Sequence, residues 1–129
     1  MAGGRIVDWS LRLIAAAILG QTLFFKFTDA PESVFIFTRL GVEPWGRYAS
    51  GIAELVAATL LLTPRGAVYG ALLAAGVMLG AIGSHLTRLG LVVQNDGGLL
   101  FALAWIVFGC AIATVHRHRH ELPRLRRAN

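Results

Sequence analysis

The chain has 129 residues, the size of a single domain. Hydrophobic residues make up 56% of it, charged residues only 15%, and the mean hydropathy is +0.65. Average soluble domains carry about 25% charged residues, so these values exclude a small soluble enzyme, and the ample apolar content excludes disorder. We therefore expect an integral membrane protein.

The net charge is +5, but the basic residues are concentrated behind the last apolar run. Five arginines occupy the last thirteen positions: Arg117, Arg119, Arg124, Arg126 and Arg127. The anionic cytoplasmic leaflet attracts such a block, so we expect the lipid bilayer as a partner and no nucleic acid. His116 and His120 have a spacing that binds metals on a helix, but they lack a third ligand and lie among arginines, so we predict no metal site. The single cysteine, Cys110, excludes a CxxC pair and small thiol oxidoreductases of that type, and we interpret it as a packing residue.

Four apolar stretches are long enough, or nearly so, to cross a membrane as helices. They cover residues 9–27, 45–63, 67–89 and 98–115, and a basic tail follows over residues 116–129. The first stretch has features of a signal peptide, but it is longer than an ordinary apolar signal region, and we expect it to be retained. The sequence thus predicts an all-α, four-helix transmembrane bundle in one domain.

The connections between these stretches carry turn signals. Pro64-Arg65-Gly66 predicts a tight turn between the second and third spans, and residues 95–98 (Asn-Asp-Gly-Gly) predict another before the fourth. Between the first two spans, Pro31 and Glu32 form a helix start, and Gly41 ends an apolar run. We expect residues 31–40 to form a short interfacial helix at the membrane surface or over the bundle.

Basic residues in the predicted loops give the orientation. With the N-terminus inside, Arg5, Arg12, Arg65 and the five C-terminal arginines lie on the inner side, against Lys26, Arg39, Arg47 and Arg88 on the outer side. This distribution predicts a multi-pass protein with both termini in the cytoplasm.

Ionisable side chains within the spans need a partner, a water-filled cavity or a function. Glu54 is about eight residues from the outer end of its span, roughly 12 Å deep at 1.5 Å per residue. Lys26, His85 and Arg88 lie near outer ends, and Gln21 lies more than one turn from Lys26. We interpret these residues as one polar site, with Glu54 and His85 handling protons and Lys26, Arg88 and Gln21 contacting a ligand.

Small residues recur every four positions in the third span, at Gly76, Gly80 and Ser84. Such a face lets a neighbouring helix approach closely. We expect this packing to bring Glu54 and His85 into a common interior, where a carboxylate and an imidazole can share a proton or bind a polar head group.

Structural explanations stay open for each of these polar residues. Glu54 paired with Lys26 would be a clasp between helices, and His85 would be an interfacial hydrogen-bonding residue. Arg88 and Lys26 would then extend to the membrane interface. Because all four lie on one side of the membrane, the functional interpretation stands beside the structural one.

Five short segments resemble the DoxX family of small bacterial membrane proteins: Phe24-Phe25-Lys26-Phe27, Leu40-Gly41-Val42-Glu43-Pro44, Gly51-Ile52-Ala53-Glu54, Leu61-Leu62-Thr63-Pro64-Arg65 and Gly80-Ala81-Ile82-Gly83-Ser84-His85-Leu86. The resemblance covers residues 6–115 and implies a four-helix transmembrane bundle in the bacterial cytoplasmic (inner) membrane. It also implies that Lys26, Glu54 and His85 form the polar site, and it transfers no agreed catalytic role.

The resemblance implies an association with redox complexes. Some members are linked to quinone-coupled oxidation, as in the DoxD-type subunit of thiosulfate:quinone oxidoreductase, and others to redox-stress complexes. Further members resemble assembly factors, such as the methylamine-utilisation membrane protein and a receptor-chaperone branch in animals.

Three functional hypotheses follow. The first is a subunit or accessory of a quinone-linked or redox-protective membrane complex, in which an outward-facing pocket binds a quinone, the one cofactor implied, and Lys26 or Arg88 stabilises its anion. The second is a non-catalytic scaffold or assembly factor, in which the Gly76/Gly80 face docks a second copy or a larger complex. The third is a small exporter, but small multidrug resistance proteins carry an essential carboxylate in the first span, where this chain has Gln21 and Lys26.

Overall fold

The computed structural model describes residues 2–90 and 97–121. Regular structure in these residues is helical throughout: α1 (Ala2–Phe27), α2 (Pro31–Arg39), α3 (Trp45–Leu62), α4 (Ala67–Ser84), the π-helix η1 (His85–Leu89), α5 (Leu99–Arg117) and the 3₁₀ turn η2 (Arg119–Glu121). The all-α prediction is therefore confirmed for the part of the chain that the structure describes.

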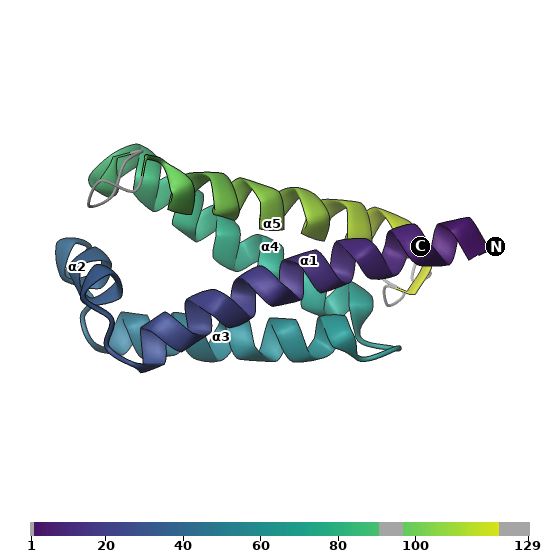
Figure 1. Ribbon diagram of the computed structural model, residues 1–129, viewed down its shortest axis with the longest axis horizontal. Coiled ribbons are helices and arrows are strands. Elements are labelled where there is room, and N and C mark those ends of the chain that lie inside the picture. Colours follow the sequence, from purple (N-terminus) through teal and green to yellow (C-terminus); the bar gives the residue numbers. More distant parts are fainter. Residues whose placement is uncertain (1, 91–96, 122–129) are drawn as a thin grey trace, which may run out of the picture.

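The four long helices form a ring in which α1 and α4 each contact both α3 and α5. Figure 1 shows the pairs α1/α3 and α4/α5 diverging towards the end of the molecule where α2 lies. At this open end, α2 contacts α1, α3 and η1. The start of α1 and the end of α5 lie at the opposite, closed end.

Within the described residues, three helical segments are long and apolar enough to cross a membrane. They are Gly4–Phe27, Ala67–Leu89 and Leu99–Arg117. The sequence predicted a fourth span over residues 45–63, but α3 is not among them, since Arg47 and Glu54 reduce its apolar character.

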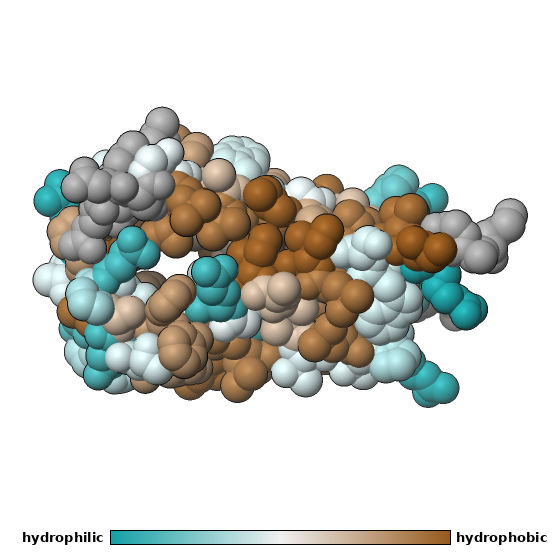
Figure 2. Space-filling model, viewed as in Figure 1, coloured by the Kyte–Doolittle hydropathy of each residue, from teal (hydrophilic) through white to brown (hydrophobic). Residues whose placement is uncertain are grey.

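The core is built mainly from alanines, with Leu19, Leu61 and Val107 among the larger side chains that are fully buried. Large apolar side chains such as Leu13 and Trp105 lie instead on the outside, where they are about half exposed. Figure 2 shows hydrophobic surface over the middle of the molecule and hydrophilic side chains towards its two ends. This distribution is typical of helices that face lipid.

Most predicted element boundaries agree with the helices. The predicted residue 31–40 helix is α2, and the turn after α3 closes through a hydrogen bond from the Gly66 amide to the Thr63 carbonyl oxygen (3.1 Å). Gly97 and Gly98 have φ values of 67° and 88°, which suit glycine in a turn. The other two turn residues, 95 and 96, and tail residues 122–129 lie outside the described residues. The sequence predicted the first span from residue 9, whereas α1 begins at Ala2. The helix therefore extends beyond the apolar stretch and includes polar residues such as Arg5 and Asp8.

The predicted close packing of the Gly76/Gly80 face is wrong within this chain. A Cβ added at Gly76 or Gly80 would meet no atom of the described residues within 4 Å beyond its own stretch of α4. The close approach between α3 and α4 occurs instead at Gly70, where an added Cβ would lie 2.8 Å from the Leu61 nitrogen and 2.9 Å from the Ala57 oxygen. Because the helix pairs diverge, α4 packs tightly against α3 at Gly70, whereas Gly76 and Gly80 line the second cavity.

Candidate functional site

Lys26 and Glu54 form a buried ion pair between α1 and α3. Their Nζ and Oε1 atoms lie 2.9 Å apart, and the side chains are 12% and 3% exposed. The Thr22 hydroxyl donates a hydrogen bond to the same Glu54 oxygen (3.2 Å). The clasp considered from the sequence is therefore present, and it neutralises both charges where water is scarce.

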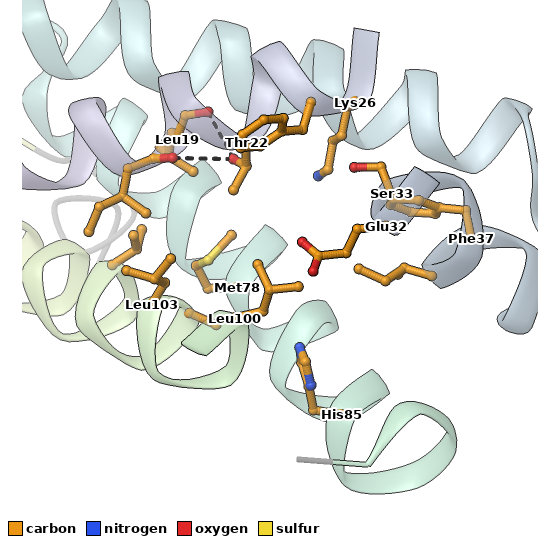
Figure 3. A pocket seen from close by; sticks show the side chains of 15 residues that line it. Leu19, Thr22, Lys26, Glu32, Ser33, Phe37, Met78, His85, Leu100 and Leu103 are labelled. Carbon is orange, nitrogen blue, oxygen red and sulfur yellow. Dashed lines mark hydrogen bonds between the residues drawn. The ribbon is translucent and has the colours of Figure 1, made fainter. Parts of the chain in front are cut away.

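A cavity of about 120 Å³ lies between the diverging helices, next to α2 (Figure 3). Fifteen residues line it, and ten of them are apolar residues of α1, α2, α4 and α5. The polar lining residues are Thr22, Lys26, Glu32, Ser33 and His85. Lys26 therefore belongs to both the ion pair and the cavity, whereas Glu54 lies outside the lining.

Glu32, in the first turn of α2, is a site residue that sequence reasoning missed. Figure 3 shows its carboxylate extending into the cavity, between Lys26 and His85 in that view. It makes no hydrogen bond or ion pair with any residue that the structure describes. The sequence signal was an acidic residue after Pro31, which ordinary helix initiation explains fully.

His85 begins the π-helix η1 and is 5% exposed. Its Nδ1 donates a hydrogen bond to the Gly90 carbonyl oxygen (2.9 Å), and its ring meets Phe101 edge-on at 5.4 Å between centroids. In the neutral ring this leaves Nε2 as a hydrogen-bond acceptor. Figure 3 shows the ring pointing towards the cavity.

A second cavity, of about 300 Å³, lies on the α3–α4 side and shares Lys26 and His85 with the first.

Two predicted ligand contacts lie elsewhere. Gln21 and Arg88 are both exposed and line neither cavity. The Arg88 main-chain oxygen accepts a long hydrogen bond from Arg39 Nε (3.4 Å). The structure thus brings Lys26 together with Glu54 on one side and with the cavity residue His85 on the other, while the roles of Gln21 and Arg88 stay predictions.

Arg47 organises the segments around α2. It is 3% exposed, makes two 2.8 Å bonds to Glu43, pairs with Asp29 at 2.5 Å and donates to the Lys26 main-chain oxygen. The hydrogen bond from Arg47 lowers the pKa of Glu43. The sequence counted Arg47 as an outer loop charge, but the side chain is buried and joins the end of α1 to the start of α3.

A second buried arginine, Arg12, lies at the closed end. Its Nε donates to the Leu61 carbonyl oxygen (2.7 Å), Nη2 donates to that of Thr63 (2.6 Å), and Nη1 pairs with Asp8 (3.2 Å). The guanidinium lies 3.8 Å from the Trp9 ring centroid. Arg12 therefore donates hydrogen bonds to carbonyl oxygens at the end of α3, which have no partner inside the helix. The sequence suggested that Arg12 was a loop charge, but its side chain is buried.

His118 connects the end of α5 to the same cluster. Its Nε2 lies 2.7 Å from Asp8, and its Nδ1 lies 2.7 Å from Glu121. Partial burial alone would lower the pKa of His118, but the hydrogen bonds to Glu121 and Asp8 outweigh it and raise the pKa. Together, Arg12 and His118 fasten α1 to α3 and α5 at this end.

Comparison with known proteins gives a family. No curated protein and no solved structure matches the chain. The model of the DoxX-like family matches residues 10–112, a range that contains Lys26, Glu54 and His85. This match spans more than half of the chain and agrees with the apolar helices described above. The chain is a membrane protein that belongs to the DoxX-like family.

Proposed function

We propose that this DoxX-like protein binds the polar head group of a quinone in the cavity beside α2, as a subunit or accessory of a quinone-linked or redox-protective membrane complex. One observation carries the proposal: Lys26, Glu32 and His85 converge on a cavity whose other walls are mostly apolar. Ligand sites are commonly apolar clefts with a few convergent polar groups. A flat ring with two oxygens fits such a lining.

Lys26, Glu54 and His85, the polar site expected from the sequence, each have a distinct role in this proposal. Lys26 donates to a ligand oxygen and stabilises negative charge that develops there. Glu54 holds Lys26 in place through their 2.9 Å ion pair. Glu54 is also the second proton carrier, and it exchanges protons with the ligand through Lys26. His85 exchanges a proton through Nε2, while Gly90 holds the opposite ring nitrogen.

The proposal includes a placement in the bacterial inner membrane. α1, α3, α4 and α5 are the four spans, α2 lies at the outer interface, and both termini face the cytoplasm. α3 can cross because its charges are compensated: Glu54 pairs with Lys26, and Arg47 pairs with Glu43 and Asp29.

Labelling of single cysteines by a membrane-impermeant thiol reagent tests this placement. Arg39→Cys should react in intact cells and Arg5→Cys should not, both in a Cys110→Ala background.

Quinone affinity tests the function directly. In the purified protein, Glu54→Gln, which loosens Lys26, should weaken binding of decylubiquinone about tenfold, the equivalent of one lost hydrogen bond from a charged group. His85→Gln should weaken binding of the reduced form, decylubiquinol, to a similar extent, because Nε2 can only accept a hydrogen bond from the ligand. Glu121→Gln, at the closed end, is the matched control and should bind normally. Circular dichroism checks that each variant is folded. Unchanged affinity in both site variants would refute the proposal.

The uncovered face of α4 favours a second candidate, a non-catalytic scaffold. Gly76 and Gly80 line the second cavity. A Cβ added there or at Gly83 would meet no described atom within 4 Å beyond the local helix, so a partner helix or a second copy can approach. Purification from native membranes tests this candidate. A stoichiometric partner that is lost in Gly80→Leu supports a scaffold, whereas an unchanged monomer in both proteins contradicts it.

A further inference from the structure

We infer that the cavity beside α2 selects a head group that carries hydroxyl groups over the corresponding carbonyl form, so that the reduced quinol is the preferred ligand. This inference rests on the proposed function and adds the chemical form of the ligand. It follows from the balance of donors and acceptors that face the cavity.

The first step concerns charge. Lys26 is the lining residue with a positive charge, and Glu54 neutralises it across 2.9 Å. Glu32 lines the same cavity and has no ion-pair partner among the described residues. The uncompensated charge beside the ligand is therefore a carboxylate, which repels the lone pairs of a carbonyl oxygen and attracts the proton of a hydroxyl.

The second step concerns hydrogen bonding. An ionised Glu32 only accepts hydrogen bonds, and the neutral His85 ring can only accept at Nε2, because Nδ1 donates to Gly90. A carbonyl head group would bond with Lys26 but would leave both acceptors without a donor. A hydroxyl can donate to either acceptor and still accept from Lys26.

The third step concerns burial. His85 is 5% exposed, Lys26 is 12% exposed and Glu32 is half-buried, so water around the head group is limited. Leaving a polar group without its partner is costly in such surroundings. Sites built to bond a ligand hydroxyl reject the analogue that lacks it. We expect the reduced form to bind at least about tenfold more tightly than the oxidised form.

Equilibrium binding of decylubiquinone and decylubiquinol tests the inference. Both ligands share a ring and a tail, and the quinol is kept reduced under anaerobic conditions. The wild-type protein should prefer decylubiquinol about tenfold. Glu32→Gln replaces an acceptor by an amide that also donates, so it should reduce the preference to less than about threefold, chiefly by weakening quinol binding. Glu32 bonds to no described residue, so the variant should fold normally.

The outcomes separate the two proposals. If the wild-type protein binds neither form, the proposed function fails. If it binds both forms equally, or the quinone more tightly, this inference fails while the proposed function stands. If the preference persists in both Glu32→Gln and His85→Gln, these residues do not set it and the assignment is overturned. Glu121→Gln, far from the cavity, should keep the wild-type preference.

Discussion

Replacing Arg12 by methionine tests whether the closed end of the bundle depends on one buried cation. Methionine keeps an apolar stem but leaves the carbonyls of Leu61 and Thr63, which lie 2.7 and 2.6 Å from the guanidinium, without a charged donor. Removing one partner of a buried ion pair costs about 3–5 kcal/mol. Asp8 keeps its 2.7 Å contact with His118, so we expect the lower end of this range, a loss of about 3 kcal/mol.

Unfolding in mixed micelles by titration with dodecyl sulfate, followed by circular dichroism, measures this loss. Arg5→Met is the matched control, because Arg5 is an exposed arginine on the same helix; it should change stability by less than about 0.5 kcal/mol. In a background where Trp45 and Trp105 are replaced by phenylalanine, Trp9 fluorescence reports locally, since the guanidinium lies 3.8 Å from its ring. If Arg12→Met is as stable as Arg5→Met, Arg12 is solvated and the reasoning about the closed end is wrong.

Two further predictions concern α4 and the end of α5. Gly70→Ala should destabilise the protein by about 1–3 kcal/mol, since the added Cβ would lie 2.8 Å from a backbone nitrogen of α3. Gly80→Ala, whose added Cβ meets no described atom within 4 Å beyond its own helix, should stabilise it by about 0.5–1 kcal/mol. If both variants had the melting temperature of the wild-type protein, both predictions would be wrong. The pKa of His118 is raised, so its stabilisation is complete below the unfolded-state value near 6.5 and is lost as the pH rises through the folded-state pKa. His118→Gln should therefore lower the melting temperature more at about pH 6 than at about pH 9, and an equal decrease at both would exclude this role.

The helices could be predicted because their signals are local. An apolar run, a proline at a helix start or a glycine in a turn acts within a few residues, so α2 and the turn at Gly66 follow from the sequence. The Lys26–Glu54 pair could also be predicted, because both residues lie within long, largely apolar helices, where an unpaired charge is costly. α3 was also predicted as a helix, but Arg47 and Glu54 leave it less apolar than the three long helices that meet the requirements for a membrane span.

The remaining features depend on how the helices are inclined to one another. Glu32 reaches the cavity only because α2 lies beside the opening between the helix pairs, and no short-range pattern contains that information. Arg12 looked like a loop charge because its acceptors are about fifty residues away, at the end of α3. The spacing of Gly76 and Gly80 showed that a helix can approach, but not whether one does.

The divergence of the two helix pairs links the cavity to the surrounding bilayer. In the proposed placement, a bundle that is narrow where α1 begins and wide where α2 lies occupies a larger area in one leaflet than in the other. Lateral pressure among the lipids of the wider leaflet pushes the pairs together and reduces the space between them. Lipids with large head groups and lipids with small ones exert this pressure at different depths. In that placement, we expect the lipid composition of a single leaflet to change the width of the cavity, without any molecule entering it.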